Sequence, residues 1–237
     1  MKIGSKTLIK IVENTICKTI VIHGQNVGSI IGLRLSQIAL NSITLTVIQQ
    51  EVIIGILLGD GYIETVGIKG QPMVQFNQGF IHLSYVLFLF NFLAPLCTHY
   101  PSLIRQRDGL YSLQIYTRCL LCLSPIYNTF MVNGHKIIPQ NIEELLSPRA
   151  LAFWSMDDGS LAGSGFYLNT QSYSYDEHIM LQNALLNKFN LQTSIHKHGD
   201  KYKLYIRAKS MDNFRSIVRP YFVDSFLYKL NSKPKGK

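Results

Sequence analysis

The sequence predicts an α+β fold made of two pseudo-symmetric copies of one unit, each with the element order αββαββα. Three observations predict it. Two short apolar helices, at about residues 53–61 and 151–159, both end in Asp-Gly. Alternating strands, an apolar helix and a basic hairpin follow each of them in the same order. A lysine closes each half at a similar distance, Lys136 in the first and Lys229 in the second, which favours a duplication over chance similarity.

Composition indicates a chain with a substantial core and an excess of positive charge. The 237 residues are 47% hydrophobic, and 23 Lys+Arg against 14 Asp+Glu give a formal net charge of +9. This length suits one large domain or two small ones. The charge favours a polyanionic partner or an anionic surface, although a basic soluble protein without such a partner would look the same. Because acidic residues are few, a carboxylate that recurs in a pattern is informative.

Two segments need a separate interpretation. The apolar run at 80–96 is shorter than the ~20 residues of a spanning helix and contains His82 and Asn91, so we expect a helix buried against a sheet and no membrane partner. Residues 1–35 are expected to be an N-terminal extension, and the sequence leaves open whether it is ordered or processed. Residues 232–237 are expected to be a basic tail.

The first half begins with the apolar helix that stops at Gly59-Asp60-Gly61, because glycine tolerates the left-handed conformation that ends helices. We expect an extended segment from Tyr62. A strand follows at 73–78, where apolar and polar residues alternate, and then an apolar helix at 80–93.

Asp108-Gly109 predicts a β-hairpin, because it separates alternating runs at 102–107 and 110–118. Its outward side chains can donate hydrogen bonds to base edges or phosphates, although a solvated strand face would look similar. They are Arg105 and Arg107 on the first strand and Ser112, Gln114, Tyr116 and Arg118 on the second. A short helix near 123–132 and a loop at 132–139 are expected next.

The second half repeats this plan. A helix at 148–157 ends in Asp157-Asp158-Gly159, and a strand at 165–171 matches the strand of the first half. The next helix opens at Ser174, with Glu177 at capping-box spacing, and runs to about Phe189. A last helix is expected at about 211–222.

A second basic hairpin precedes that last helix, with strands at 194–198 and 201–207 around Gly199-Asp200. Its outward face carries basic, imidazole and aromatic side chains, namely His196, His198, Lys201, Lys203, Tyr205 and Arg207. The alternation of the two histidines is weak support for a metal site, and a solvated or DNA-facing strand is favoured.

The chain contains two such helices, and the elements that follow each of them come in the same order. Residues 36 to about 230 therefore resemble the LAGLIDADG homing endonucleases of the single-chain, two-motif type. The segments LAFWSMDDG, YLNTQS, NKF and YKL of the second half carry much of the likeness. The resemblance implies a DNA-binding saddle, with the two motif helices at the internal interface between repeats at 36–145 and 146–231. It also implies a monomer that requires no protein partner.

The resemblance also implies the catalytic residues. Asp60 and Asp158 match the metal-binding positions, and Lys136 and Lys229 match the basic residues that flank the two scissile phosphates. Polar residues near the positions that order attacking waters are Asn77, with Gln78 as its rival, and Gln171. Further DNA contacts are expected from Gln75 and Asn169.

Physical reasoning agrees with a metal site. Two carboxylates at helix C-termini repel each other and the DNA phosphates, and a divalent cation offsets these repulsions. Mg²⁺ is expected, as two or three ions that Mn²⁺ or Ca²⁺ can replace in binding, because it completes its shell with water and phosphate oxygens. The expected site comprises Asp60, Asp158, Gly59 and Asp157, with Asp157 orienting or screening rather than binding. Close approach of the two helices needs small residues, which Gly55 and Gly59 supply in the first. Phe153 and Asp157 occupy the matching places in the second, so the packing should not be symmetric.

The predicted function is that of a site-specific, intron-encoded endonuclease that hydrolyses both strands of double-stranded DNA and leaves staggered ends. Because the two hairpin faces differ, the target should be long and asymmetric. One alternative is an RNA maturase that assists splicing of its own intron. Another is a DNA-binding regulator with a decayed site, which the intact Asp and Lys set disfavours. An organellar location is expected, in the mitochondrion rather than the chloroplast.

Overall fold

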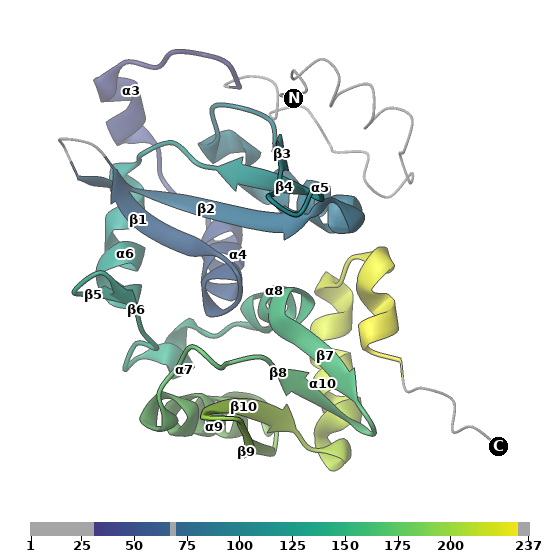
Figure 1. The fold of residues 1–237 in the computed structure, drawn as a ribbon. Coiled ribbons are helices and arrows are strands. Elements are labelled where there is room, and N and C mark those ends of the chain that lie inside the picture. The colour runs from purple at the N-terminus through teal and green to yellow at the C-terminus, as the bar shows by residue number, and fades with distance from the viewer. Residues whose placement is uncertain (1–30, 67–69, 232–237) are drawn as a thin grey trace. The chain divides into compact units, whose positions relative to one another are not determined.

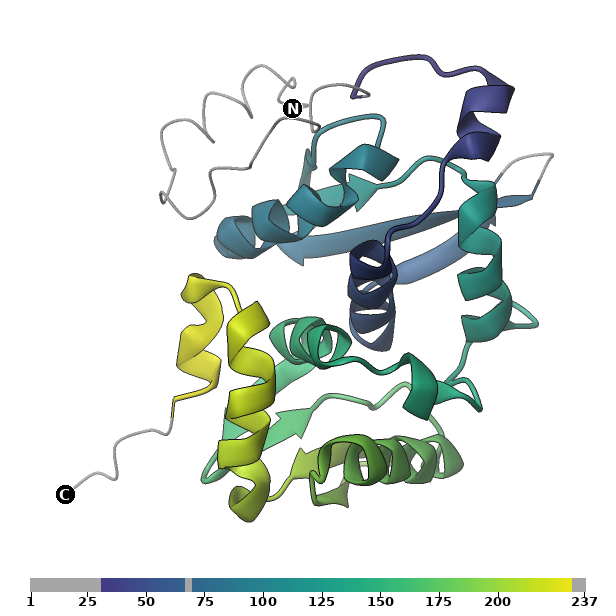
Figure 2. The ribbon, with the colours of Figure 1, turned by 180° about the vertical axis from the view of Figure 1, so that it is seen from behind.

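The computed structural model describes residues 31–66 and 70–231 (Figures 1 and 2). Most of the expected extension at 1–35 and all of the expected basic tail at 232–237 lie outside these residues. No helix within the described part of the chain is long and apolar enough to cross a membrane.

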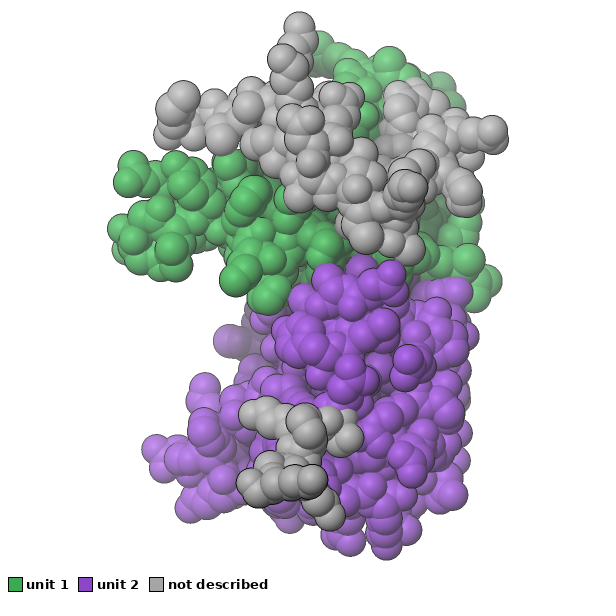
Figure 3. Space-filling view, turned by 90° about the vertical axis from the view of Figure 1, so that its right-hand side faces the viewer, with its two compact units in different colours: residues 1–49, 61–127 green, residues 50–60, 128–237 purple. Residues whose placement is uncertain are grey.

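The chain forms two compact units, which are coloured separately in Figure 3. The first unit joins the residues up to Gln49 to Gly61–Tyr127, and the second joins Gln50–Asp60 to the residues from Asn128 onward. The first motif helix is therefore grouped with the second half of the chain. The predicted repeat boundaries, 36–145 and 146–231, follow the sequence pattern instead and stay a prediction.

The first unit is a four-stranded antiparallel sheet with helices on one side. Its strand order is β1-β2-β4-β3. Helix α5 packs against this sheet (Figure 2), over the buried residues Val74, Phe76, Leu113 and Ile115. The elements are α3 (Gln37–Ser42), β1 (Tyr62–Val66), β2 (Gln71–Gly79), α5 (Leu83–Leu93), β3 (Ser102–Arg105), β4 (Tyr111–Tyr116) and the start of α6 (Ser124–Phe130), with 3₁₀ turns at Phe80–His82, Ala94–Leu96 and Leu121–Leu123.

The second unit repeats that sheet, in the order β7-β8-β10-β9, and this confirms the duplicated α+β plan. Helix α9 contacts β9 and β10, and α10 packs on α8 behind the sheet (Figure 2). The elements are α4 (Val47–Leu58), β5 (Met131–Val132), β6 (His135–Lys136), α7 (Ile142–Leu145), α8 (Pro148–Asp158), β7 (Gly159–Ala162), β8 (Gly165–Leu168), α9 (Tyr175–Phe189), β9 (Thr193–His198), β10 (Lys201–Ile206) and α10 (Met211–Val218), with 3₁₀ turns at Ala208–Ser210, Arg219–Tyr221 and Asp224–Lys229.

The N-terminus of α9 has the predicted capping box. Ser174 Oγ accepts a hydrogen bond from the Glu177 N–H, and the Glu177 carboxylate accepts one from the Ser174 N–H. Glu177 also accepts a hydrogen bond from the Ile138 N–H at 2.8 Å, so the cap holds the loop before α7. The helix ends at Asn190, which has the left-handed conformation (φ 52°).

Several predicted boundaries were wrong. Strand β3 ends at Arg105, because the chain turns at 106–110, where Gly109 has φ +84°. Arg107 therefore lies in the turn and not on a strand face, contrary to the prediction. Strand β8 ends at Leu168 rather than at residue 171, so Asn169 and Gln171 lie beyond it.

The predicted loop at 132–139 and the predicted last helix also differ from the structure. The loop contains a small hairpin of β5 and β6, in which Asn133 (φ 50°) and Gly134 (φ 77°) form the turn. Positive φ at both positions is the signature of the tight turns that join antiparallel strands. The last helix, α10, ends at Val218, because Pro220 follows in a 3₁₀ turn.

A buried polar network joins α9 to the sheet of the second unit. The His178 Nδ1–H donates to the Ser174 carbonyl at 2.7 Å, so Nε2 is left to accept from the Thr170 hydroxyl at 2.8 Å. Thr170 Oγ in turn accepts from the Leu204 N–H at 3.1 Å. His178 and Thr170 are fully buried, so each hydrogen bond replaces one with water that the site excludes.

We therefore expect Thr170→Val to lower the free energy of unfolding by roughly 2–4 kcal/mol, because it leaves the Leu204 N–H and the accepting nitrogen of His178 buried without a hydrogen-bond partner. Urea denaturation measures this. Thr193→Val is the matched control: the Thr193 hydroxyl is also buried but has no partner among the described residues, so its removal should change stability by less than about 1 kcal/mol. An equal decrease in the free energy of unfolding in the two variants would contradict a stabilising role for the network.

Candidate active site

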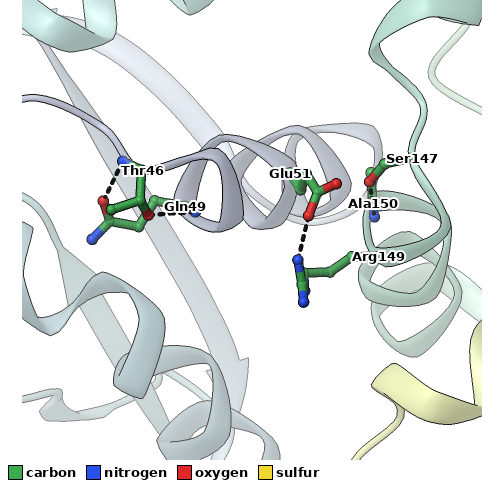
Figure 4. A network of polar contacts seen from close by, with 6 residues as sticks. All are labelled: Thr46, Gln49, Glu51, Ser147, Arg149 and Ala150. Carbon is green, nitrogen blue, oxygen red and sulfur yellow. Dashed lines mark hydrogen bonds and ion pairs between the residues drawn. The ribbon is translucent and has the colours of Figure 1, made fainter.

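Helix α4 has a capping box at its start (Figure 4). The Thr46 hydroxyl accepts a hydrogen bond from the Gln49 N–H at 3.2 Å, and the Gln49 side chain accepts one from the Thr46 N–H at 2.9 Å. Gln49 Nε2 also donates to the Phe92 carbonyl at 3.1 Å. These contacts fix where the helix begins.

Helices α4 and α8 approach closely at the two predicted glycines. A Cβ added to Gly55 would lie 2.6 Å from the Ala150 carbonyl oxygen and 2.7 Å from the Phe153 Cβ. A Cβ added to Gly59 would lie 2.6 Å from Asp157 Oδ2. The predicted close approach through the two glycines and the predicted asymmetry of the packing are confirmed, and each glycine lies against the larger residue at the matching place in α8.

The other ends of the two helices are joined by an ion pair. Arg149, in the first turn of α8, hydrogen-bonds to the carboxylate of Glu51 in α4 (Figure 4). The Arg149 guanidinium also lies 4.9 Å from the centre of the Tyr221 ring. Ser147 caps α8 by accepting a hydrogen bond from the Ala150 N–H. The pair is partly exposed, so its main effect is to orient the helices.

Each motif helix ends against one of the two predicted lysines. Lys136 Nζ donates to the Gly59 carbonyl at 2.8 Å, just past the end of α4. Lys229 Nζ donates to the Met156 carbonyl of α8 at 2.5 Å and lies 4.6 Å from the centre of the Phe226 ring. Carbonyls in the last turn of a helix have no partner within it, and a cation there also meets the negative end of the helix dipole.

Two further side chains, whose roles at the helix ends sequence reasoning missed, complete these caps. The Tyr173 hydroxyl donates to the carbonyls of Leu57 and Leu58, at 3.4 and 3.3 Å. The Asn169 side chain donates to the Asp158 carbonyl at 2.7 Å, and its N–H donates to the same oxygen at 3.0 Å. Asn169 had been predicted only as a DNA contact. No local pattern identifies a cap that comes from another element of the fold.

Asp157 connects the two motifs. Its Oδ2 accepts a hydrogen bond from the Asp60 N–H at 2.8 Å. Its Oδ1 is buried and has no hydrogen-bond partner among the described residues. Asp157 thus fixes the backbone at Asp60, the geometry expected of an orienting residue. Whether it has that role in catalysis stays a prediction.

The acidic and basic groups at the two helix ends perturb one another. Burial, together with the charge of Asp60, raises the pKa of Asp158 to about 7, against the opposing effect of the two lysines. Burial and then the charges of Asp60 and Asp158 raise the pKa of Asp157 well above its ordinary value. Burial lowers the pKa of both Lys136 and Lys229, and the three aspartates act against this. The cluster is therefore short of positive charge.

These groups fit a divalent cation in their chemistry. The donors are carboxylate oxygens, which hard cations prefer, and one of them, Asp157 Oδ1, is buried without a partner. Within residues 31–66 and 70–231, no group of three or more His, Cys, Asp or Glu side chains could hold a metal by itself. A cation bound here would take its remaining ligands from water or from a bound phosphate.

Only some of the residues predicted to contact DNA in the first unit lie together on one face of its sheet. Asn77 lies opposite Gln114, and Gln75 opposite Tyr116, so these four share one face of the sheet. Ser112 shares this face by register, as predicted, but it is buried and accepts a hydrogen bond from Gln106 at 2.5 Å, and its contact with DNA stays a prediction.

The predicted arginines of the first unit do not share that face. Arg105 lies opposite Tyr111, on the side of the sheet that carries Leu103. Arg118 follows β4 and donates to the Leu33 carbonyl at 3.0 Å. The prediction that Arg118 shares a strand face with Gln114 was therefore wrong.

In the second unit the predicted face exists. Register places Lys201 opposite His198, Lys203 opposite His196 and Tyr205 opposite Ser194, all on one side of the sheet. Arg207 is exposed but follows the end of β10. The two residues predicted to order water differ in setting: Asn77 is exposed on β2, and Gln171 is half-buried in the turn before α9.

Comparisons with known proteins agree with this geometry. Residues 50–214 match the model of the LAGLIDADG DNA endonuclease family. Cytochrome b mRNA maturase bI2 of Debaryomyces hansenii is 33% identical over 196 residues, which span 77% of this chain and 73% of that protein. Probable intron-encoded endonuclease 1 of Wickerhamomyces canadensis is 31% identical over 79% of this chain and 85% of its own. The solved structure of the homing endonuclease I-WcaI bound to its DNA recognition sequence superposes with a TM-score of 0.72, at 28% identity, covering 81% of this chain and 89% of that one.

The helix contact itself gives a prediction. We expect Gly55→Ala to lower the free energy of unfolding by about 1–3 kcal/mol, because the added methyl forces the helices apart. The control is Gly79→Ala, where the nearest atom would lie at 3.8 Å and φ is −55°, so stability should hold or rise slightly. Urea denaturation compares the two. A Gly55→Ala protein as stable as the wild type would contradict the close approach of α4 and α8.

Proposed function

Because the chain belongs to the LAGLIDADG DNA endonuclease family, we propose that it is a site-specific endonuclease that cuts both strands of a long, asymmetric DNA target and leaves staggered ends. The observation that carries the proposal is the pair of motif helices that end together. They bring Asp60, Asp158, Lys136 and Lys229 into one electrostatically coupled cluster. A DNA partner is supported by the similarity to I-WcaI, which was solved with its recognition sequence.

In this proposal Asp60 and Asp158 hold divalent cations, with Mg²⁺ as the natural ion and Mn²⁺ or Ca²⁺ as substitutes in binding. A bound ion would stabilise the attacking and leaving oxygens of phosphodiester hydrolysis. Its positive charge would also favour the ionised form of Asp158, whose pKa burial and then the charge of Asp60 raise. Gly59 and Asp157 border the same site, and Asp157 orients Asp60 through its hydrogen bond.

The remaining roles belong to positive and polar groups. Each lysine ammonium lies at a helix end beside an aspartate, where it can neutralise negative charge that develops on the phosphate. Asn77 and Gln171 are proposed to order the attacking waters. One such site for each strand would produce the double-strand break. The repeats at 36–145 and 146–231 and a monomeric state remain part of the proposal.

An RNA maturase is the second candidate, because a relative named as a cytochrome b mRNA maturase is 33% identical to this chain. The partner would then be the intron that encodes the protein. The retained aspartates and lysines do not exclude that activity. For either function, an organellar location, in the mitochondrion rather than the chloroplast, stays part of the proposal.

We expect Asp158→Asn to slow cleavage by at least about a hundredfold while the protein still binds DNA, because it removes a proposed metal ligand and leaves the sheets unchanged. The substrate is a supercoiled plasmid that carries the intron-free allele of the host gene, incubated with Mg²⁺. Gel analysis separates nicked from linear product.

Asp176→Asn is the matched control, since Asp176 is an exposed residue in the first turn of α9, and it should cleave like the wild type. Undiminished cleavage by Asp158→Asn would contradict the proposed site. If the wild type leaves the plasmid intact but restores splicing of its intron transcript, the maturase function is the correct one.

Metal binding can be tested without cleavage. We expect Ca²⁺ or Mg²⁺ to raise the melting temperature of the wild type, because an ion that binds only the folded state stabilises it by about 2.7 kcal/mol at a hundredfold excess over its Kd. The shift should vanish in Asp60→Asn and Asp158→Asn and persist in Asp176→Asn. A shift that survives in Asp158→Asn would place the ion elsewhere.

A further inference from the structure

The open faces of the two four-stranded sheets differ in chemistry, and strand register defines each face. The polar side chains of the first face that are not buried include Tyr62, Glu64, Gln75, Asn77, Gln114 and Tyr116 of β1, β2 and β4, and Met73 and Ile104 share this face. The second face consists of side chains from β8, β9 and β10, namely Tyr167, Ser194, His196, His198, Lys201, Lys203 and Tyr205. In both sheets most residues of the opposite side are buried under helices, and exposed ones such as Lys197 lie near strand ends.

The polar groups of the first face are mostly amides and hydroxyls. Glu64 is the only charged residue on it among the described strand positions, and its carboxylate accepts a hydrogen bond from Gln75 Nε2 at 3.0 Å. The Tyr116 hydroxyl donates to Gln114 Oε1 at 2.8 Å. Both contacts orient an amide on the strand. The first face therefore offers directional hydrogen bonds and little attraction for phosphate.

The second face is basic. Lys201 and Lys203 alternate along β10, opposite His198 and His196 of β9. No acidic residue stands on this face in the described strands β7–β10. Lysine is a compact charge that attracts a phosphate without demanding one orientation.

The aromatic groups of the second face form a fixed platform. His196 Nδ1 lies 2.9 Å from the Tyr167 hydroxyl, and His196 Nε2 lies 3.0 Å from the Ser194 hydroxyl. The imidazole stacks on the Tyr205 ring at 4.9 Å and 21°. Gly165 makes room for Tyr205, since a Cβ there would lie 2.3 Å from its ring. Both ring nitrogens of His196 are thus engaged inside the protein, so in this inference the residue supports its neighbours, and its predicted contact with DNA stays untested.

We propose that the two faces divide the binding of DNA between them. The first face reads base pairs through Gln75, Asn77 and Gln114, because carboxamides pair in two-point fashion with adenine edges. The second face binds the sugar-phosphate backbone through Lys201 and Lys203, and the Lys203 ammonium lies 5.9 Å from the centre of the Tyr167 ring in the aromatic platform. This inference rests on the proposed DNA-binding function and specifies which half of the target carries sequence information.

Two consequences distinguish this arrangement from one in which both faces read bases and bind phosphates equally. Base substitutions cost more affinity in the half of the target bound by the first face. The salt dependence of binding comes mainly from the other half, since each phosphate contact changes the slope of log Kd against log salt by about 0.9. Substitutions that reduce the salt dependence of binding should therefore differ from those that reduce base discrimination.

The test uses a labelled duplex that the wild type selects from a randomised pool, with Ca²⁺ in place of Mg²⁺. Fluorescence anisotropy gives Kd from about 50 to about 200 mM salt. We expect Lys201→Met and Lys203→Met each to lower the slope by about 0.9 and to leave base preferences unchanged. Gln75→Ala and Gln114→Ala should keep the slope but lose about tenfold of the discrimination at one or two base pairs.

Lys197→Met is the matched control, because Lys197 is exposed on β9 but its register partner is Tyr202, which places it on the opposite side of the sheet. Its slope should equal that of the wild type, and melting curves confirm that every variant folds. Equal slope losses in Lys197→Met and Lys203→Met, or altered base preferences in Lys203→Met, would overturn the division while DNA binding stands. A wild type that enriches no duplex, or enriches only RNA, would overturn the DNA-binding function as well.

Discussion

The site depends on one contact, the close approach of α4 and α8. With glycine at 55 and 59, the backbone of α4 reaches the Phe153 and Asp157 side chains of α8 directly. The two helices can then end at the same level, which puts two aspartates, two lysines and Asp157 within electrostatic range of one another. Any side chain at position 55 would separate the helices and, with them, the charges.

That proximity lowers the stability of the unliganded protein. Burial and neighbouring carboxylates raise the pKa of Asp157 and Asp158, so ionising them disfavours the folded state as pH rises from the ordinary range of Asp towards about 7. The protein offsets this locally. Lys136 and Lys229 lie on helix-end carbonyls, and the Tyr173 hydroxyl satisfies two more. The caps thus hold the helix ends in place while the carboxylates stay available to a cation.

The sequence was sufficient for what is local and periodic. It predicted both motif helices, the order of elements along each half, the capping box at Ser174 and the asymmetry between the glycines of the first motif helix and the larger residues at the matching places in the second. It did not predict features that depend on residues which only the fold brings together. Asn133-Gly134 is a strong turn signal, but strands of two residues show no alternation to support it. Whether Ser112 or His196 can contact DNA depends on partners that only the folded sheet brings together.

The two motif helices carry different residues at their contact positions, which is possible because both repeats lie in one chain. In a symmetric dimer the matching positions of the two helices carry the same residue, so a glycine on one helix cannot have a larger residue at the matching place on the other. A single chain can place Gly55 against Phe153 and Gly59 against Asp157, which gives close packing and leaves room for one buried carboxylate. The same freedom lets the two sheet faces diverge, one towards amides and the other towards lysines. A palindromic target would not use that difference, whereas an asymmetric target does.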